Sequence, residues 1–204
     1  MGKPAVIFDL SMGKRLSFDP QFRFALEGKP WSFIFWWRYK LVKSDKFLFT
    51  IGAHPAFTFK TVTISTDDNS KEIIMTQRYL AGELSPNYFV AKNISIGMYY
   101  LYGHCLEEDA IRNTHFLTLN ANFSNIKLSN QFYMRFVPQI YYLKMDESDG
   151  FYFTSSLTLA RRYFPITISA LINKTIQTEI SASKNLVWNA SLIYTFSKKY
   201  VKVQ

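Results

Sequence analysis

The sequence predicts an all-β fold: an antiparallel up-and-down transmembrane β-barrel of about ten strands, or of twelve in a longer parent protein. Two observations carry this prediction. Apolar and polar residues alternate with a period of two through almost all of the 204 residues, which is the pattern of strands with one apolar and one polar face. Aromatic residues make up 18% while mean hydropathy is only −0.06, and no uncharged run reaches the roughly 18 residues that a membrane helix needs.

The alternation is clearest in residues 31–41. The odd-numbered positions are aromatic or aliphatic, whereas the even-numbered ones include Ser32 and Arg38. A helix would scatter both sets around its axis, so the segment is predicted to be a strand. Each predicted strand has about the 9–11 residues with which a tilted strand crosses a bilayer. The ten segments are 18–27, 31–41, 47–60, 73–88, 94–103, 117–124, 132–142, 151–159, 166–175 and 186–196.

Two segments need separate treatment. In 73–88 the apolar face also carries Arg78, so we expect a bulge or a position at the membrane interface there. Residues 4–12 alternate too and would make an eleventh strand, although bacterial single-chain barrels have even strand numbers. Either this segment lies outside the barrel or a further N-terminal strand is absent. We expect one domain over 1–204, with ten visible strands and a tail at 197–204.

Composition excludes several classes of protein. The single Cys105 rules out an intramolecular disulfide and a zinc site made of cysteines. The net charge of +9 is scattered, since no run of Lys and Arg exceeds two residues, and this argues against a nucleic-acid partner. Residues 1–10 lack the basic and apolar regions of a secretion signal, so we expect either that a signal peptide was removed upstream or that the sequence begins inside a longer protein.

A soluble β-sandwich or lipocalin-like barrel, with its apolar face inside, is the alternative. Two features favour a membrane barrel instead. The face opposite the apolar one is mainly Ser, Thr, Asn, Gly and Tyr, with few charges, and the alternation lasts for about ten residues in strand after strand. We therefore interpret the apolar face as lipid-facing. Closure is then expected, because an open edge in hydrocarbon leaves backbone groups unsatisfied.

The last predicted strand, LVWNASLIYTF, resembles the C-terminal insertion signal of the outer-membrane β-barrels of Gram-negative bacteria. The resemblance implies a location in the bacterial outer membrane, contact with its lipid and lipopolysaccharide, and recognition by the barrel-assembly machinery. It also implies that the end of this strand is periplasmic. The chain departs from the family pattern because 197–204 follow the terminal aromatic residue. The residues that carry the resemblance are Trp188, Leu192, Tyr194 and Phe196.

Counting strands back from that end predicts that the connections 27–30, 65–72, 105–113, 145–150 and 181–185 lie at the outer surface. More than half of the 15 acidic residues fall in these segments, and the shorter connections on the other side are basic. Short periplasmic turns and longer outer loops are typical of transmembrane barrels. The candidate acidic loop residues are Asp67, Asp68, Glu107, Glu108, Asp109, Asp146, Glu147 and Asp149.

The polar face would line the lumen, where its charges have two interpretations. They set the selectivity of a pore, or they pair with one another in a closed interior, as in small barrels whose interiors are filled by side chains. The candidate lumen residues are Arg23, Arg38, Arg135, Lys60, Asp19, Glu27 and Glu83.

No motif for catalysis or for cofactor or metal binding is present. His104 and His115 flank the acidic segment 105–113, but no Ser/His/acid arrangement accompanies them. The protein is therefore predicted not to be an enzyme and to bind no cofactor. The predicted function is passive passage of small polar solutes or ions. The alternatives are a non-conducting structural or surface-interaction barrel that acts through its acidic loops, and an outer-membrane hydrolase.

Overall fold

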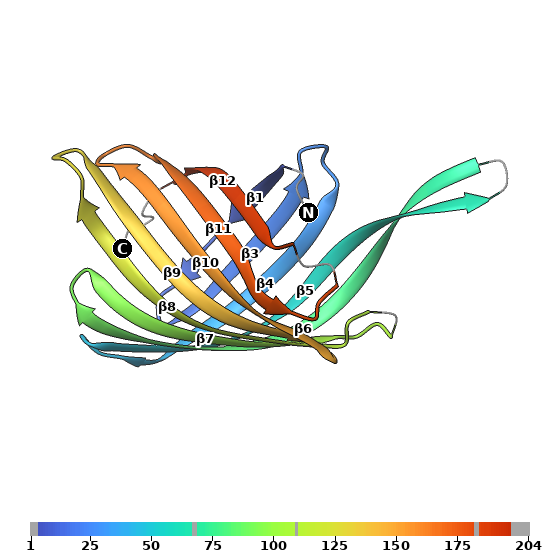
Figure 1. Cartoon of the computed structure of the whole chain (residues 1–204), viewed down its shortest axis with the longest axis horizontal. Helices are drawn as coiled ribbons and strands as arrows, with labels where there is room; N and C mark the ends of the chain where they lie inside the picture. The colour runs from blue at the N-terminus through green and yellow to red at the C-terminus, as the bar shows by residue number, and fades with distance from the viewer. Residues whose placement is uncertain (1–3, 67–68, 109, 182–183, 197–204) are drawn as a thin grey trace, which may run out of the picture.

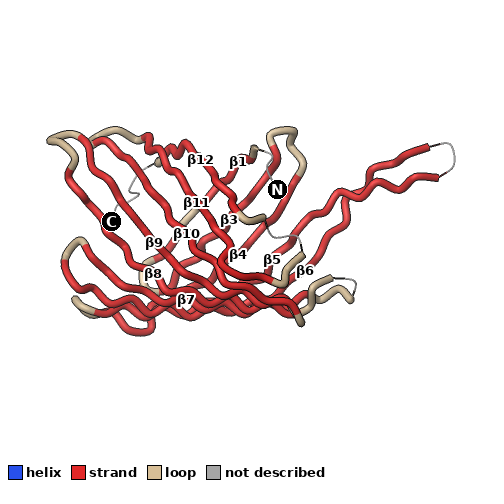
Figure 2. The backbone as a smooth tube through the Cα atoms, viewed as in Figure 1, coloured by secondary structure: helices blue, strands red, loops and turns tan. Residues whose placement is uncertain are grey.

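A computed structural model describes residues 4–66, 69–108, 110–181 and 184–196. Within this part of the chain the regular structure is entirely β-strand, as the tube in Figure 2 makes plain. No helix in the described residues is long and apolar enough to cross a bilayer. The strands are β1 (Ala5–Asp9), β2 (Met12–Gly13), β3 (Leu16–Ala25), β4 (Pro30–Lys43), β5 (Phe47–Thr66), β6 (Asn69–Ala91), β7 (Ile94–Cys105), β8 (Asn113–Lys127), β9 (Phe132–Met145), β10 (Ser148–Arg161), β11 (Ile166–Thr178) and β12 (Leu186–Tyr194).

These strands form one antiparallel meander. The order is β1-β3-β4 and then each strand beside the next as far as β12, with β2 also on β3. The sheet curls strongly, so that β7 lies opposite the two edge strands β1 and β12 (Figure 1). The predicted ten-strand meander is confirmed, although its last strand ends at Tyr194 and not at Phe196.

The N-terminal segment belongs to the sheet. β1 and β2 both pair with β3, and the amide of Leu10 between them donates to the carbonyl of Pro20 at 3.1 Å. Of the two sequence-based alternatives, a position outside the barrel is therefore wrong. Counted from β1 to β12, the described sheet has an odd number of antiparallel strands in its order. The two edge strands β1 and β12 therefore run in the same direction.

The two faces of the sheet are inverted relative to a soluble protein. The side chains of Ile96, Leu119 and Ile140 are about half exposed in the isolated chain, whereas the alternate positions Ser95 and Thr118 are buried. A soluble sandwich or lipocalin would bury the apolar set. The outer face is therefore suited to lipid and the inner face is polar, as the alternation predicts.

β5 and β6 continue beyond their neighbours as a hairpin that projects from the sheet (Figure 1). The last pair between β4 and β5 is Ser32 with Thr58, and the last between β6 and β7 is Tyr79 with Cys105. Residues 59–66 of β5 pair only with residues 69–76 of β6. We call these two segments, residues 59–66 and 69–76, the β5–β6 arm.

The arm corrects one sequence-based expectation, and β9–β10 corrects another. Segment 65–72 is largely strand, because its polar residues pair across the hairpin as far as Thr66 with Asn69. Segment 145–150 is likewise strand on both sides of Asp146 and Glu147. Turn-forming residue types do not end a strand where a cross-strand partner continues the ladder. The antiparallel order nevertheless places both connections at the same end as 105–113, which we call the long-loop end; the opposite end is the short-turn end.

Candidate functional site

Arg38 of β4 is the centre of a charged cluster on the inner face. Its Nε donates to Oε1 of Glu83 at 2.6 Å, and its terminal nitrogen donates to Oδ2 of Asp19 at 3.2 Å. The three residues come from β4, β6 and β3, so the guanidinium of Arg38 connects strands that lie on either side of β4. Planar guanidinium forks suit this recognition of carboxylates.

Gly52 leaves room for the ion pair between Arg38 and Glu83, which crosses the intervening strand β5. Arg38 pairs with Gly52 on β5, and Gly52 pairs with Glu83 on β6, so the three lie on one rung of the sheet. A Cβ at Gly52 would lie 2.7 Å from Oε1 and 2.9 Å from Cγ of Glu83. The missing side chain leaves the space in which Arg38 and Glu83 meet across the middle strand.

Neutral donors complete the cluster. Ser11 and Ser17 donate to Asp19 at 2.6 and 2.9 Å, and the Tyr99 hydroxyl donates to Glu83 at 2.7 Å. The Glu83 side chain is only 2% exposed. A buried carboxylate is costly unless it is paired and hydrogen-bonded, and here both conditions are met. We call Ser11, Ser17, Asp19, Arg38, Glu83 and Tyr99 the Arg38 cluster.

A hollow of about 400 Å³ opens beside this cluster, with Asp19 and Arg38 in its wall. The guanidinium also lies over the ring of Trp36 at 4.2 Å, in cation–π geometry. Trp36 in turn contacts the buried ring of His54, with the ring centroids 3.8 Å apart. The charged groups are therefore held in fixed positions next to open space.

The inner face changes character after β7, where aromatic rings replace charges. Phe116 lies 5.1 Å from Tyr141, and Tyr141 stacks on Tyr152 at 4.8 Å. The Tyr141 hydroxyl donates to Asn173 at 3.1 Å, and the Tyr152 hydroxyl shares a 2.7 Å hydrogen bond with Thr178. Apart from Arg135 on β9, the polar groups described in this half of the wall are hydroxyl and amide groups.

The other predicted lumen residues are scattered. Arg135 donates through Nε to Asn122 at 2.6 Å, and Nε of Arg23 is buried without a hydrogen bond to any described residue. Two placements differ from the prediction. Lys60 lies on the β5–β6 arm, and Glu27 lies in the turn between β3 and β4. Alternation assigned both residues to the inner face, but β5 pairs only with β6 at Lys60, and Glu27 follows the end of β3.

Several predicted acidic loop residues hold the long-loop end together. Glu107 accepts from the backbone amide and from Nε of Arg78, at 2.6 and 2.7 Å. This contact places Arg78 at the rim of the sheet. Of the two alternatives predicted for Arg78, a bulge or a position at the membrane interface, this placement agrees with the second. Asp146 accepts from the backbone amides of Arg112 and Asn113, at 2.9 and 2.7 Å.

These contacts lower the pKa of both carboxyl groups. The Arg78 guanidinium holds the pKa of Glu107 below its ordinary value, and the Asn113 amide does the same for the pKa of Asp146. Asp149 accepts from the Tyr142 hydroxyl at 2.8 Å, whereas Glu108 and Glu147 are exposed. The predicted residues Asp67, Asp68 and Asp109 lie outside the described residues.

The histidines at this end bond to neutral groups. His104 Nδ1 lies 3.0 Å from Oδ1 of Asn113, and His115 Nδ1 lies 2.9 Å from the Tyr100 hydroxyl. No group of three His, Cys, Asp or Glu side chains in the described part of the chain is arranged to hold a metal ion.

The residues that carry the C-terminal resemblance all lie at or just after the edge strand β12, with exposed apolar side chains. Tyr194 and Phe196 contact each other at the short-turn end, with ring centroids 4.5 Å apart. The residues concerned are Trp188, Leu192, Tyr194 and Phe196.

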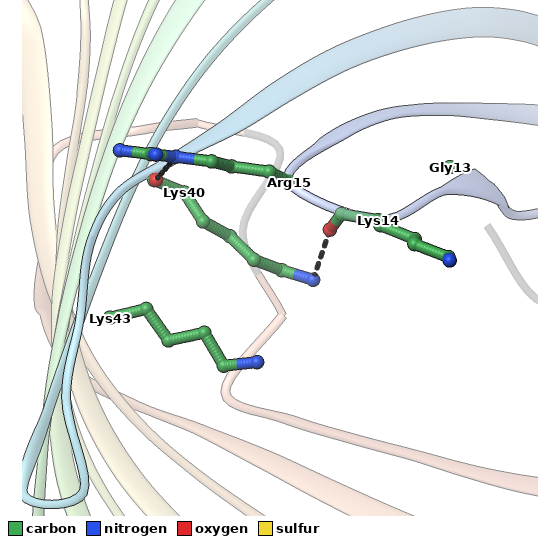
Figure 3. Close-up of a pocket in the computed structure, with 5 residues that line it drawn as sticks. All are labelled: Gly13, Lys14, Arg15, Lys40 and Lys43. Atoms are coloured by element: carbon green, nitrogen blue, oxygen red, sulfur yellow. Dashed lines mark hydrogen bonds between the residues drawn. The ribbon is translucent and has the colours of Figure 1, made fainter.

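Sequence reasoning missed a cavity of about 660 Å³ at the short-turn end, lined by Gly13, Lys14, Arg15, Lys40 and Lys43 (Figure 3). The signal in the sequence was the basic character of the short turns. It did not reveal that the β2–β3 turn and the end of β4 would share one pocket.

No model of a known protein family matches the chain, and no curated protein matches it in sequence. Several solved structures are similar, among them two structures of OmpT. The loop L8 deletion mutant of OmpT, an outer membrane protein of Vibrio cholerae, aligns with a TM-score of 0.55 and 9% identity, over 94% of this chain and 62% of its own. In-vitro folded OmpT of the same organism aligns with a TM-score of 0.50 and 8% identity, over 84% of this chain and 53% of its own.

The chain therefore has the fold of an outer-membrane β-barrel, and it spans 62% and 53% of the two similar structures. The class of protein that the C-terminal resemblance indicated agrees with this fold, and so does the predicted location in the bacterial outer membrane.

Proposed function

We propose that this protein is a passive outer-membrane channel for small polar solutes or ions. The observation that carries the proposal is the Arg38 cluster. It fixes charged side chains beside a hollow on the inner face of a sheet whose outer face is apolar. Fixed charges and hydrogen-bonding groups along a pore wall are the means by which channels discriminate solutes.

The mixture of charges on the inner face points to general rather than sharply ion-selective passage. Arg38 pairs with two carboxylates, those of Asp19 and Glu83. Arg135, which bonds to a neutral amide, offsets the excess negative charge. Opposite charges that pair with each other project little field into the lumen. The size of the opening and the hydroxyl and amide groups of β8–β11 would then govern which solutes pass.

A second candidate function is a non-conducting barrel that binds a partner at the cell surface. The observation in its favour is the β5–β6 arm, which projects beyond the neighbouring strands (Figure 1). The acidic residues Glu107 and Asp146 are poorer candidates for this role, because their carboxylates already bond within the protein.

We also propose that the protein is not an enzyme. The ring nitrogens of His104 and His115 that make hydrogen bonds do so with an amide and a hydroxyl, not with an orienting acid as in a catalytic triad. Hydrolytic turnover that disappears on His104→Ala or His115→Ala would contradict this.

The exposed apolar face supports a further part of the proposal, which concerns partners. Outer-membrane lipid and lipopolysaccharide would cover it, and the barrel-assembly machinery would act on β12 and Phe196, whose apolar side chains are exposed. Heat-modifiable mobility in SDS gels is expected for the folded protein. Stable monomeric behaviour in detergent-free buffer would contradict the membrane assignment.

Single-channel recording in planar bilayers tests the proposed function. We expect discrete current steps from the full chain after refolding into detergent. A preparation that shows heat-modifiable mobility and yet stays silent over repeated insertions would exclude the channel and favour the surface-interaction barrel.

A further inference from the structure

The cavity at the short-turn end is lined by four cationic side chains and no acidic one (Figure 3). Lys14 and Arg15 come from the turn between β2 and β3, and Lys40 and Lys43 come from the end of β4. Like charges in one pocket repel one another, so this arrangement lowers stability unless something compensates for it.

A bulge in β4 puts the two β4 lysines on the same side of the sheet. Residues 40 and 43 are three apart, and in a regular strand they would face opposite ways. The register against β5 shifts between Lys40 and Val42, so that Lys40 pairs with Thr50 and Lys43 pairs with Leu48. Thr50 and Leu48 share a face, and therefore Lys40 and Lys43 both point into the cavity (Figure 3). Bulges that re-aim a side chain in this way are common next to functional sites.

The turn between β2 and β3 is equally constrained. Gly13 has φ +117°, and a Cβ there would lie 2.1 Å from the Leu16 carbonyl oxygen. Only glycine readily adopts this backbone conformation. The turn holds Lys14 and Arg15 in place at the cavity wall.

The cations of this cavity bond to neutral groups only. Lys40 Nζ donates to the Lys14 carbonyl at 2.7 Å, and Arg15 Nε donates to the Lys40 carbonyl at 3.3 Å. The Arg15 guanidinium also lies 5.1 Å from the centroid of the Tyr39 ring. Within the described residues, the ammonium groups of Lys14 and Lys43 make no hydrogen bond or ion pair.

Some other cations in the described part of the chain differ from these four because they have carboxylate partners. Arg38 has Asp19 and Glu83, and Arg78 has Glu107. The cavity is thus lined by positive charges whose counter-charge is not supplied by the described protein.

We propose that this cavity binds a small soluble anion that carries two or more phosphate groups. The inference deepens the proposed channel and rests on it, since it names the solute class that the mouth of the lumen would collect. Lysine ammonium groups and an arginine fork suit phosphate oxygens, and about 660 Å³ lies within the usual range of small-molecule sites. A soluble ligand is favoured over a lipid headgroup because Lys40 and Lys43 lie on the inner face, as Arg38 does.

Calorimetric titration of inorganic pyrophosphate into the full chain in neutral detergent tests the site. We expect saturable binding to one site, weakened about tenfold in a Lys40→Gln/Lys43→Gln variant because two charge-assisted contacts are lost. The matched control is Lys92→Gln, in the turn between β6 and β7 at the same end, which should leave the affinity unchanged. Equal affinity in all three proteins would overturn the proposal.

Two further arms separate the remaining explanations. Phosphatidylglycerol in mixed micelles should not compete with pyrophosphate; full competition at equal phosphate concentration would assign the cavity to lipid and overturn the soluble ligand. Binding is measured without current, so the site and the channel are tested separately. Pyrophosphate binding by a protein that gives no current would contradict the channel proposal and support the anion site. Current steps without pyrophosphate binding would contradict the anion site and support the channel.

Discussion

Arg38 and Lys40 lie two residues apart on the same face of β4, yet their surroundings differ completely. Arg38 meets two carboxylates, because Asp19 lies on β3 and the gap at Gly52 admits Glu83. Lys40 pairs with Thr50, and its ammonium group reaches only the carbonyl of Lys14. The comparison shows that the residues paired with a charged side chain on the adjacent strands determine whether its charge is neutralised within the protein.

Removal of the Arg38 charge is expected to have the largest effect on stability. In Arg38→Met the carboxylate of Glu83, which is 2% exposed, loses its cationic partner and keeps only the hydrogen bond from the Tyr99 hydroxyl. The free energy of unfolding should fall by about 3–5 kcal/mol, as measured by urea titration in lipid vesicles. Lys40→Met should cost far less, because it leaves no buried carboxylate without a partner.

The double variant Arg38→Gln/Glu83→Gln provides the control. Its two amides can hydrogen-bond to each other across Gly52, so most of the lost stability should return. If the single variant is as stable as the wild type, Arg38 does not compensate Glu83, and the contrast with Lys40 fails.

Gly52→Ala should have the next largest effect. The added methyl group meets Glu83 at 2.7 Å, and overpacking of this kind costs about 1–3 kcal/mol. Gly82→Ala is the matched control on the adjacent strand, since its nearest neighbour would be the Gly52 carbonyl oxygen at 3.9 Å. Equal unfolding free energies of the two variants would show that Gly52 is not needed for the bridge.

Acidification should loosen the long-loop end at lower pH than an unperturbed carboxylate would predict. The pKa values of Glu107 and Asp146 are lowered in the folded state, so their contribution is complete above the unfolded values of about 4. It is lost as pH falls through the lower folded values. We expect the Arg112 and Asn113 amides to lose protection from hydrogen exchange in that range.

The control for this pH effect is Asp146→Asn, in which protection at Arg112 and Asn113 should be weak at neutral pH already. Protection that persists in this variant with an unchanged pH profile would mean that Asp146 does not close the loop.

The alternation in the sequence was sufficient to predict most of the strands and their lipid-facing sides. Residues 94–103 illustrate the reason, since Ile96 is exposed and Ser95 buried as the period of two requires. The alternation does not predict where along a strand the neighbouring strands end. Lys60 follows the inner-face pattern, but the walls beside the β5–β6 arm have ended at that height.

The candidate site was predicted only in part. Asp19, Arg38 and Glu83 were expected on the inner face, but their meeting depends on the register that aligns them around Gly52. The basic cavity depends on the bulge before Lys43, and a one-residue shift of this kind cannot be inferred from the alternation itself.

The most direct test of the central claim asks whether the inner face lines a conducting path. Asn120 and Leu119 are adjacent residues on β8; Asn120 faces inward, whereas the Leu119 side chain is half exposed on the outer face. The variants Asn120→Cys and Leu119→Cys would both be made with Cys105→Ser. We predict that a charged thiol reagent reduces the single-channel current of Asn120→Cys and leaves the current of Leu119→Cys unchanged. Current that is equally insensitive in both variants, or the absence of any current from folded protein, would contradict it.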